Sequence, residues 1–139
     1  GRTNKLVDSC YSFWQAAVFP LLAEITEKSK SAGDASRSQL SDQSDYWLFD
    51  SRALQNYILI CCQDTEDGGL RDKPSKSPDF YHTCYALSGL SICQHVKNGK
   101  LDIVGKPSTN QLAPTHPVYN ITLDAEQKAR CFFGVLSPP

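Results

Sequence analysis

The feature that most constrains the fold is a pattern that occurs twice in the sequence. An aspartate is followed by a hydroxyl residue and then by an aromatic one, from Asp8 to Trp14 and again, with the same spacing, from Asp79 to Tyr85. Aspartate is a preferred N-cap residue, and a loop that contains lysine precedes it in both copies. Helical hairpins that repeat with their helix starts at one end form an α-solenoid or a closed α–α barrel. The sequence therefore predicts an all-α fold of this kind, with a functional site at the shared end.

Apolar residues spaced by three and four positions predict four helices. They are expected over residues 8–28, 47–63, 79–96 and 123–132. Pro20 lies inside the first helix and should kink it, because proline has no amide hydrogen and its ring clashes with the carbonyl of Ala16. Asp50 or Ser51 is the expected cap of the second helix, and Asp79 that of the third. No strand pattern of comparable strength is present.

Two segments interrupt this pattern within a domain expected to span residues 1–139. Residues 29–45 are rich in Ser, Asp and Gly, and we interpret them as a flexible surface insertion. From about residue 98 the pattern weakens, and Pro107, Pro114 and Pro117 should break any regular element. An irregular tail is therefore expected, apart from the short helix near its end.

The composition excludes several classes of protein. The 14 basic and 15 acidic residues give a net charge of −1, so a nucleic-acid partner is not expected. No apolar run approaches the ~20 residues that a membrane span requires. The six cysteines include no C-x-x-C pair, which favours a reduced, cytoplasmic protein over a disulfide framework. The 139 residues include no Met, and we expect them to be a piece of a longer chain.

Three residues are candidate metal ligands: Asp8, Cys10 and His82. Positions i and i+2 of a helix lie about 200° apart, so Asp8 and Cys10 share one ion only if Asp8 is at the helix N-cap. The repeat places Cys10 and His82 at nearly equivalent positions of two helices. A carboxylate, a thiolate and an imidazole together favour Zn²⁺. Three protein ligands leave one position open, as in catalytic zinc sites, for water or for a substrate thiol that loses its proton there.

Charged and aromatic residues near the helix starts are further candidates. Arg2 and Lys5 suit a phosphate or diphosphate at a helix N-terminus, although solvated loop charges have the same sequence pattern. Asp72 suits Mg²⁺ beside a diphosphate, or an ion pair with a lysine. The aromatic residues near these helix starts, which belong either to the core or to the open end of a barrel, are Tyr11, Trp14, Tyr81 and Tyr85.

Four segments carry the most specific motifs: Gly1-Arg-Thr-Asn-Lys-Leu-Val-Asp-Ser-Cys-Tyr-Ser-Phe-Trp14, Gly68-Gly-Leu-Arg-Asp-Lys-Pro74, Asp79-Phe-Tyr-His-Thr-Cys-Tyr-Ala-Leu-Ser-Gly-Leu90 and Pro114-Thr-His-Pro-Val-Tyr-Asn120. They resemble the β subunits of protein prenyltransferases. The motif that begins at Asp79 is similar to the version found in farnesyltransferases. The match runs to about Asn120, and the tail beyond it diverges.

This resemblance implies an α–α barrel that transfers a farnesyl group from farnesyl diphosphate to the cysteine thiol of C-terminal C-a-a-X proteins. It implies that Asp8, Cys10 and His82 hold zinc, and that the substrate thiolate attacks C1 of the isoprenoid. The other implied roles are diphosphate binding by Arg2, Lys5 and Tyr11, a link to Mg²⁺ through Asp72, an isoprenoid contact by Trp14 and a peptide contact by Tyr81. The implied partner is an α subunit, in a heterodimer.

The family's barrel needs more helices than these residues provide, so we expect only part of it here, and an isolated chain that is inactive or a poor enzyme. Three alternatives stay open. The first is a geranylgeranyltransferase β subunit, and the second is a non-catalytic helical-repeat binding module. The third is a structural zinc site, for which His95 or Cys84 would be the fourth ligand.

Overall fold

A computed structural model describes residues 4, 7–31, 48–95 and 99–135. The described residues are helical, with three isolated β-bridges and no strand. The elements in chain order are α1 (Tyr11–Trp14), α2 (Val18–Ser31), α3 (Ser51–Tyr57), the π-helical turn η2 (Ile58–Cys62), α4 (Phe80–Gln94), α5 (Pro107–Asn110) and α6 (Leu123–Gly134). The predicted all-α class is therefore confirmed. None of these helices is long and apolar enough to cross a membrane.

The prediction of one continuous helix over residues 8–28 is wrong. The chain forms two helices, and the break lies between Trp14 and Val18 rather than at Pro20. Just before the proline, backbone hydrogen bonds join residues three apart instead of four: the amide of Phe19 donates to the carbonyl of Ala16. Pro20 then falls in the first turn of α2, where a missing amide hydrogen leaves no carbonyl without a partner. The interruption between Trp14 and Val18 thus removes the helical turn with which the ring of Pro20 would clash.

The second and third predicted helices are confirmed with shifted ends. Asp50 caps α3, its carboxylate accepting from the amide of Ala53 at 2.8 Å. The last turn of this segment is π-helical. Asp79 caps α4 in the same way, accepting from the amide of His82 at 2.8 Å. Both aspartates have the extended backbone of an N-cap, which explains why a single residue type was enough to predict each helix start.

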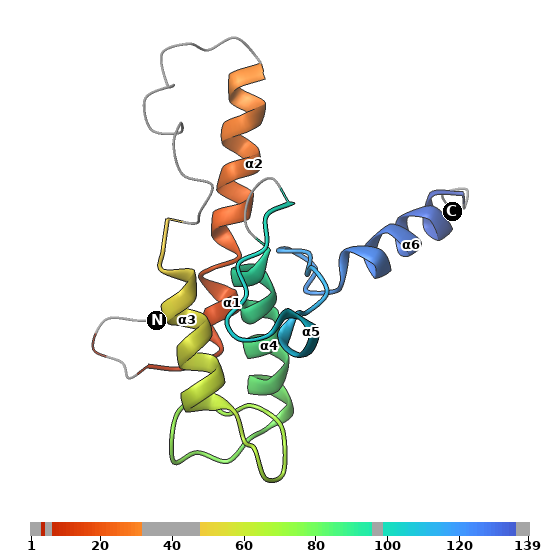
Figure 1. The fold of residues 1–139 in the computed structure, drawn as a ribbon. Coiled ribbons are helices and arrows are strands. Elements are labelled where there is room, and N and C mark those ends of the chain that lie inside the picture. Colours follow the sequence, from red (N-terminus) through yellow and green to blue (C-terminus); the bar gives the residue numbers. More distant parts are fainter. Residues whose placement is uncertain (1–3, 5–6, 32–47, 96–98, 136–139) are drawn as a thin grey trace.

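The short helix α1 lies directly against α4 (Figure 1). The contact is close because Gly89 has no side chain: a Cβ there would lie 2.1 Å from Oγ of Ser12 and 2.5 Å from its carbonyl carbon. The hydroxyl of Ser12 donates to the carbonyl of Tyr85 at 3.3 Å. This approach brings the start of α1 beside the start of α4, although the two helices are far apart in the sequence.

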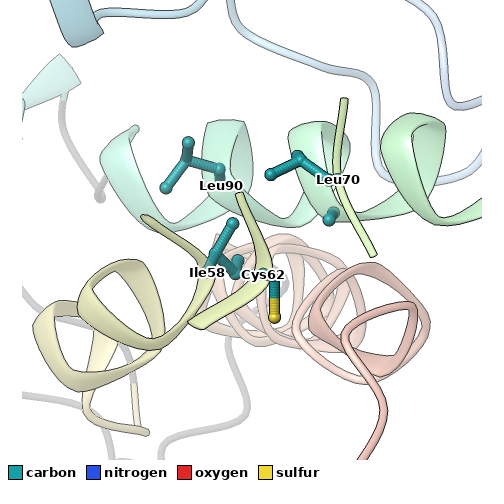
Figure 2. Packing of buried hydrophobic residues seen from close by; sticks show 5 residues of the cluster. Ile58, Cys62, Leu70 and Leu90 are labelled. Atoms are coloured by element: carbon teal, nitrogen blue, oxygen red, sulfur yellow. The ribbon is translucent and has the colours of Figure 1, made fainter. Parts of the chain in front are cut away.

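Two small apolar clusters hold the helices together. The first joins η2 to α4 and contains Ile58, Cys62, Leu70, Ala86 and Leu90 (Figure 2). The second joins α1 to α4 and contains Phe13, Ala16, Ala17 and Ile92. Ile58, Cys62 and Ala86 are completely buried. The contacts therefore converge on α4, which is the central element of the described residues.

The segment after α4 is more ordered than the predicted irregular tail. Pro107 begins α5 instead of breaking a helix, because proline is favoured in the first helical turn. Two buried glutamines anchor this segment: Gln55 bonds the backbone of Asp102 and Val104, and Gln94 bonds that of Asn110 and Leu112.

The last helix confirms the prediction for residues 123–132 and ends at Gly134. It projects away from the other helices in Figure 1. The predicted insertion at 29–45 began too early, since Ser31 is the last residue of α2. Its remaining part lies outside the described residues.

Candidate metal centre

The Asp8 carboxylate is placed by a turn that precedes α1. Its Oδ1 accepts from the amide of Cys10 at 2.9 Å, and the amide of Tyr11 donates to the carbonyl of Asp8 at 3.3 Å. The prediction that Asp8 is the N-cap residue is wrong by two positions, since Cys10 holds that place. The reason for expecting a cap still applies. Asp8 lies outside the helical backbone, so its side chain and that of Cys10 reach the same point.

His82 lies in the first turn of α4, three residues after the cap residue Asp79. Its Nδ1 lies 2.7 Å from Oδ2 of Asp79, and its Nε2 lies 3.3 Å from Oδ1 of Asp8. Hydrogen bonds from the backbone and ring of His82 lower the pKa of Asp79, so this carboxyl group is ionised at neutral pH and can only accept. Nδ1 therefore donates its proton to Asp79, while Nε2 faces the carboxylate of Asp8.

The ligand atoms of Asp8, Cys10 and His82 lie within 4.8 Å of one another. One carboxylate oxygen, one thiolate sulfur and one imidazole nitrogen form a donor set that suits Zn²⁺. No other residue in the described part of the chain joins this cluster. Cys84 instead contacts Nδ2 of Asn120 at 3.5 Å, and Nε2 of His95 lies 2.8 Å from the carbonyl of Leu112. The two residues considered as a fourth ligand are thus engaged elsewhere.

The protein groups around Cys10 disfavour a free thiolate. Burial, a hydrogen bond with Asp8 and the negative charges of Asp8 and Asp72 raise the pKa of Cys10 to about 11. Burial also acts to raise the pKa of Asp8, but bonds from Cys10 and the positive charges of His82 and Lys73 lower it overall. The cluster is therefore a carboxylate beside a protonated thiol, an arrangement that a bound dication would convert to a thiolate.

Aromatic residues border the cluster on one side. Trp14 and Tyr85 have ring centroids 4.7 Å apart, and those of Tyr81 and Tyr85 are 4.8 Å apart. Nε1 of Trp14 donates to the hydroxyl of Tyr81 at 3.3 Å. Trp14 and Tyr81 are each about half exposed, at 49% and 50%, whereas the neighbouring Phe13 is buried at 3%. Of these three aromatic residues, Phe13 thus belongs to the core, and Trp14 and Tyr81 are partly exposed at the surface.

An open cavity of about 680 Å³ lies beside α1. The residues that line it include Asp8, Tyr11 and Trp14, together with Phe19, Leu22 and Phe49. Tyr11 follows Cys10 directly, and its amide donates to the carbonyl of Asp8 at 3.3 Å. Arg2 and Lys5, the predicted cations of the same motif, lie outside the described residues.

Asp72 lies on the loop that runs beside the Asp8 turn. One carboxylate oxygen pairs with Nζ of Lys73, and the other is buried without a hydrogen-bond partner in the described part of the chain. The ion pair with a lysine, one of two roles expected from the sequence, is thus present. The unpaired carboxylate oxygen is a candidate ligand for a cation. Ser9, which the sequence did not single out, bonds this loop through both its amide and its hydroxyl.

A family model described as the prenyltransferase alpha-alpha toroid domain matches residues 1–121. The chain belongs to the prenyltransferase alpha-alpha toroid family. The predicted barrel fold is therefore confirmed, with part of a toroid in these residues.

Several relatives of this toroid chain carry the name protein farnesyltransferase subunit beta. The chain is 38% identical over 187 residues to the one from Pisum sativum, an alignment that covers 98% of this chain and 44% of the relative. It is 40% identical over 141 residues to the one from Schizosaccharomyces pombe, and this alignment covers 96% of this chain and 34% of the relative. The identity to the one from Saccharomyces cerevisiae is 32% over 145 residues, and this alignment covers 96% of this chain and 29% of the relative. The chain spans less than half the length of these relatives.

Proposed function

We propose that this chain carries the zinc centre of a protein farnesyltransferase β subunit. The observation that carries the proposal is the cluster of Asp8, Cys10 and His82, with His82 oriented by Asp79. The names of the relatives support the same activity. The proposed reaction is transfer of the farnesyl group of farnesyl diphosphate to the cysteine thiol of C-a-a-X proteins, in a heterodimer with an α subunit.

The three ligand side chains would hold zinc, leaving one coordination position for the substrate. Bound zinc would lower the pKa of a substrate thiol, so that it reacts as a thiolate at neutral pH. Asp79 would hold the His82 proton on Nδ1 and so leave Nε2 free to ligate the metal. This division of roles is the usual one in zinc sites, where a carboxylate orients a ligating histidine.

The neighbouring residues would bind and orient the two substrates. Tyr11 lies next to the cluster and, with Arg2 and Lys5, would bind the diphosphate, whose leaving charge such donors stabilise. The unpaired oxygen of Asp72 would hold Mg²⁺ beside it. The exposed ring of Trp14 would contact the isoprenoid, and that of Tyr81 the peptide.

The cysteines support a reducing compartment, and we propose the cytoplasm. All six are unpaired thiols in the structure, Cys10 among them. A thiol ligand must be reduced to bind zinc, and disulfides are rare in reducing compartments.

Zinc content and transfer activity test the proposal together. The full-length β chain, purified with its α subunit, should contain one zinc per chain, and Cys10→Ala and His82→Ala should each lose it. Cys84→Ala is the matched control, since this exposed thiol lies on the same helix as His82 but outside the cluster. Wild-type protein should farnesylate a peptide that ends in C-a-a-X.

The same assay separates the alternatives. A preference for geranylgeranyl diphosphate would replace the farnesyl assignment by the related transferase. Bound zinc with no transfer of either group would favour a binding module. Zinc that survives both ligand substitutions would mean that the metal is held elsewhere.

A further inference from the structure

Ser9 lies between two metal ligands and is almost completely buried. It separates Asp8 from Cys10 in the sequence, and its exposed fraction is 2%. None of the proposed chemistry needs a hydroxyl group at this position. A buried polar side chain is stable only when it is hydrogen-bonded, so the partners of Ser9 show what it holds.

Both hydrogen-bond donors of Ser9 bond one short loop. Its amide donates to the carbonyl of Asp72 at 2.9 Å, and its Oγ donates to the carbonyl of Arg71 at 2.8 Å. Two consecutive carbonyls thus accept hydrogen bonds from one residue, and the Asp72 carbonyl also accepts a long one from Sγ of Cys62 at 3.9 Å. Because the side chain is buried, water cannot replace the lost bond if the hydroxyl is removed.

A further contact runs between the same two segments. Nζ of Lys73 lies 3.4 Å from the carbonyl of Val7 and also pairs with the carboxylate of Asp72. The turn at residues 7–10 and the loop at residues 71–73 are therefore joined at several points, with Ser9 as the buried one. A shift of either segment would displace the other.

We propose that Ser9 is a positioning residue that couples the zinc ligands to the Asp72 carboxylate, so that the two cation sites keep a fixed relation. This inference rests on the proposed function, in which Asp72 holds the Mg²⁺ of the diphosphate. The thiol acceptor and the diphosphate donor must approach at a set distance for transfer to occur. One residue that is next to both Asp8 and Cys10 and bonded to the Asp72 backbone sets that distance.

The direct test is Ser9→Ala in the full-length β chain with its α subunit. At saturating zinc, the Mg²⁺ concentration for half-maximal farnesyl transfer should rise at least about fivefold, the lower range of coupling between linked sites. Ser12→Ala is the matched control: Ser12 is also buried and also donates to a carbonyl, but to that of Tyr85 on α4. It should leave the Mg²⁺ dependence unchanged. An unchanged Mg²⁺ dependence in Ser9→Ala would overturn the coupling.

Hydrogen exchange in the wild-type protein gives a test that needs no variant to fold. Removing zinc with a chelator should speed exchange in peptides that cover residues 7–12 and 70–75 together, while residues 86–94 stay protected. A response confined to residues 7–12 would also overturn the inference. Failure of the proposed function is recognised separately, because the wild-type protein would then bind no zinc or would not transfer a farnesyl group.

Discussion

Nδ1 of His82 lies 2.7 Å from Oδ2 of Asp79, the residue that also caps the helix on which His82 lies. One carboxylate therefore fixes both the start of α4 and the orientation of the imidazole. Its Oδ1 accepts from the His82 amide, and its Oδ2 accepts from the ring. Helix formation and ligand orientation thus depend on the same side chain.

This relationship predicts the outcome of Asp79→Asn. An asparagine oxygen still caps the helix, but the neutral amide no longer holds the proton on Nδ1 as strongly. Zinc affinity should fall by about 10- to 100-fold, the range for carboxylates that orient a ligating histidine. Competition with a zinc chelator measures this change in affinity.

Asp50→Asn is the control for that substitution. Asp50 caps α3 in the same manner and contacts no metal ligand. Helix content should be unchanged in both variants by circular dichroism, and zinc affinity should be unchanged in Asp50→Asn. Equal zinc affinity in the two variants would show that Asp79 acts only as a cap.

Zinc binding should strengthen as pH rises. The protein groups around Cys10 raise the pKa of its thiol to about 11, chiefly by burial, so the thiol is protonated at neutral pH. Zinc must displace this proton, and the apparent dissociation constant should therefore fall about tenfold per pH unit between pH 7 and 9. Chelator competition at several pH values, corrected for protonation of the chelator, gives the slope. Binding that is independent of pH in this range would contradict thiolate ligation by Cys10.

Gly89→Ala should loosen the contact between α1 and α4. The added Cβ would lie 2.5 Å from the backbone of Ser12, so the two helices must separate. We expect a loss of about 1–3 kcal/mol in the free energy of unfolding, measured by urea denaturation, and weaker zinc binding. Gly134→Ala is the control, because no atom lies within 4 Å of its added Cβ. Comparable losses in both variants would mean that the close approach is unimportant.

Gln55→Leu tests the buried anchor of the segment after α4. The side chain of Gln55 is fully buried and bonds the carbonyl of Asp102 at 2.7 Å and the amide of Val104 at 3.1 Å. Leucine leaves both groups unpaired, so the free energy of unfolding should fall by about 2–4 kcal/mol. Gln127→Leu, at an exposed position of α6, should change it little. Thermal melts of the two variants side by side measure the difference.

The starts of α3 and α4 could be predicted from the sequence because each depends on one residue and its neighbours. Asp50 and Asp79 cap their helices through bonds to amides three positions ahead. The break before Pro20 was placed wrongly because the chain relieves the proline clash several residues upstream. The start of α5 at Pro107 was missed because proline favours a first helical turn as well as a break.

The candidate metal ligands could be predicted from the sequence, but the residues that position them were not. Asp8, Cys10 and His82 were found from their chemistry and from the repeat. The orienting role of Asp79 was missed, although an aspartate three residues before a histidine at a helix start is a usable signal. Ser9 gave no signal at all, because its partners at residues 71 and 72 become neighbours only in the folded chain.

Asp8 and His82 belong to segments that lie far apart in the sequence, and a metal ion shared by them would act as a cross-link. Unlike a disulfide, which restricts the unfolded chain, the ion would stabilise the native topology by binding only where the two segments meet. An ion that binds only the folded state adds about 2.7 kcal/mol when its free concentration is a hundred times its dissociation constant. The melting temperature of the protein would then report the zinc supply around it.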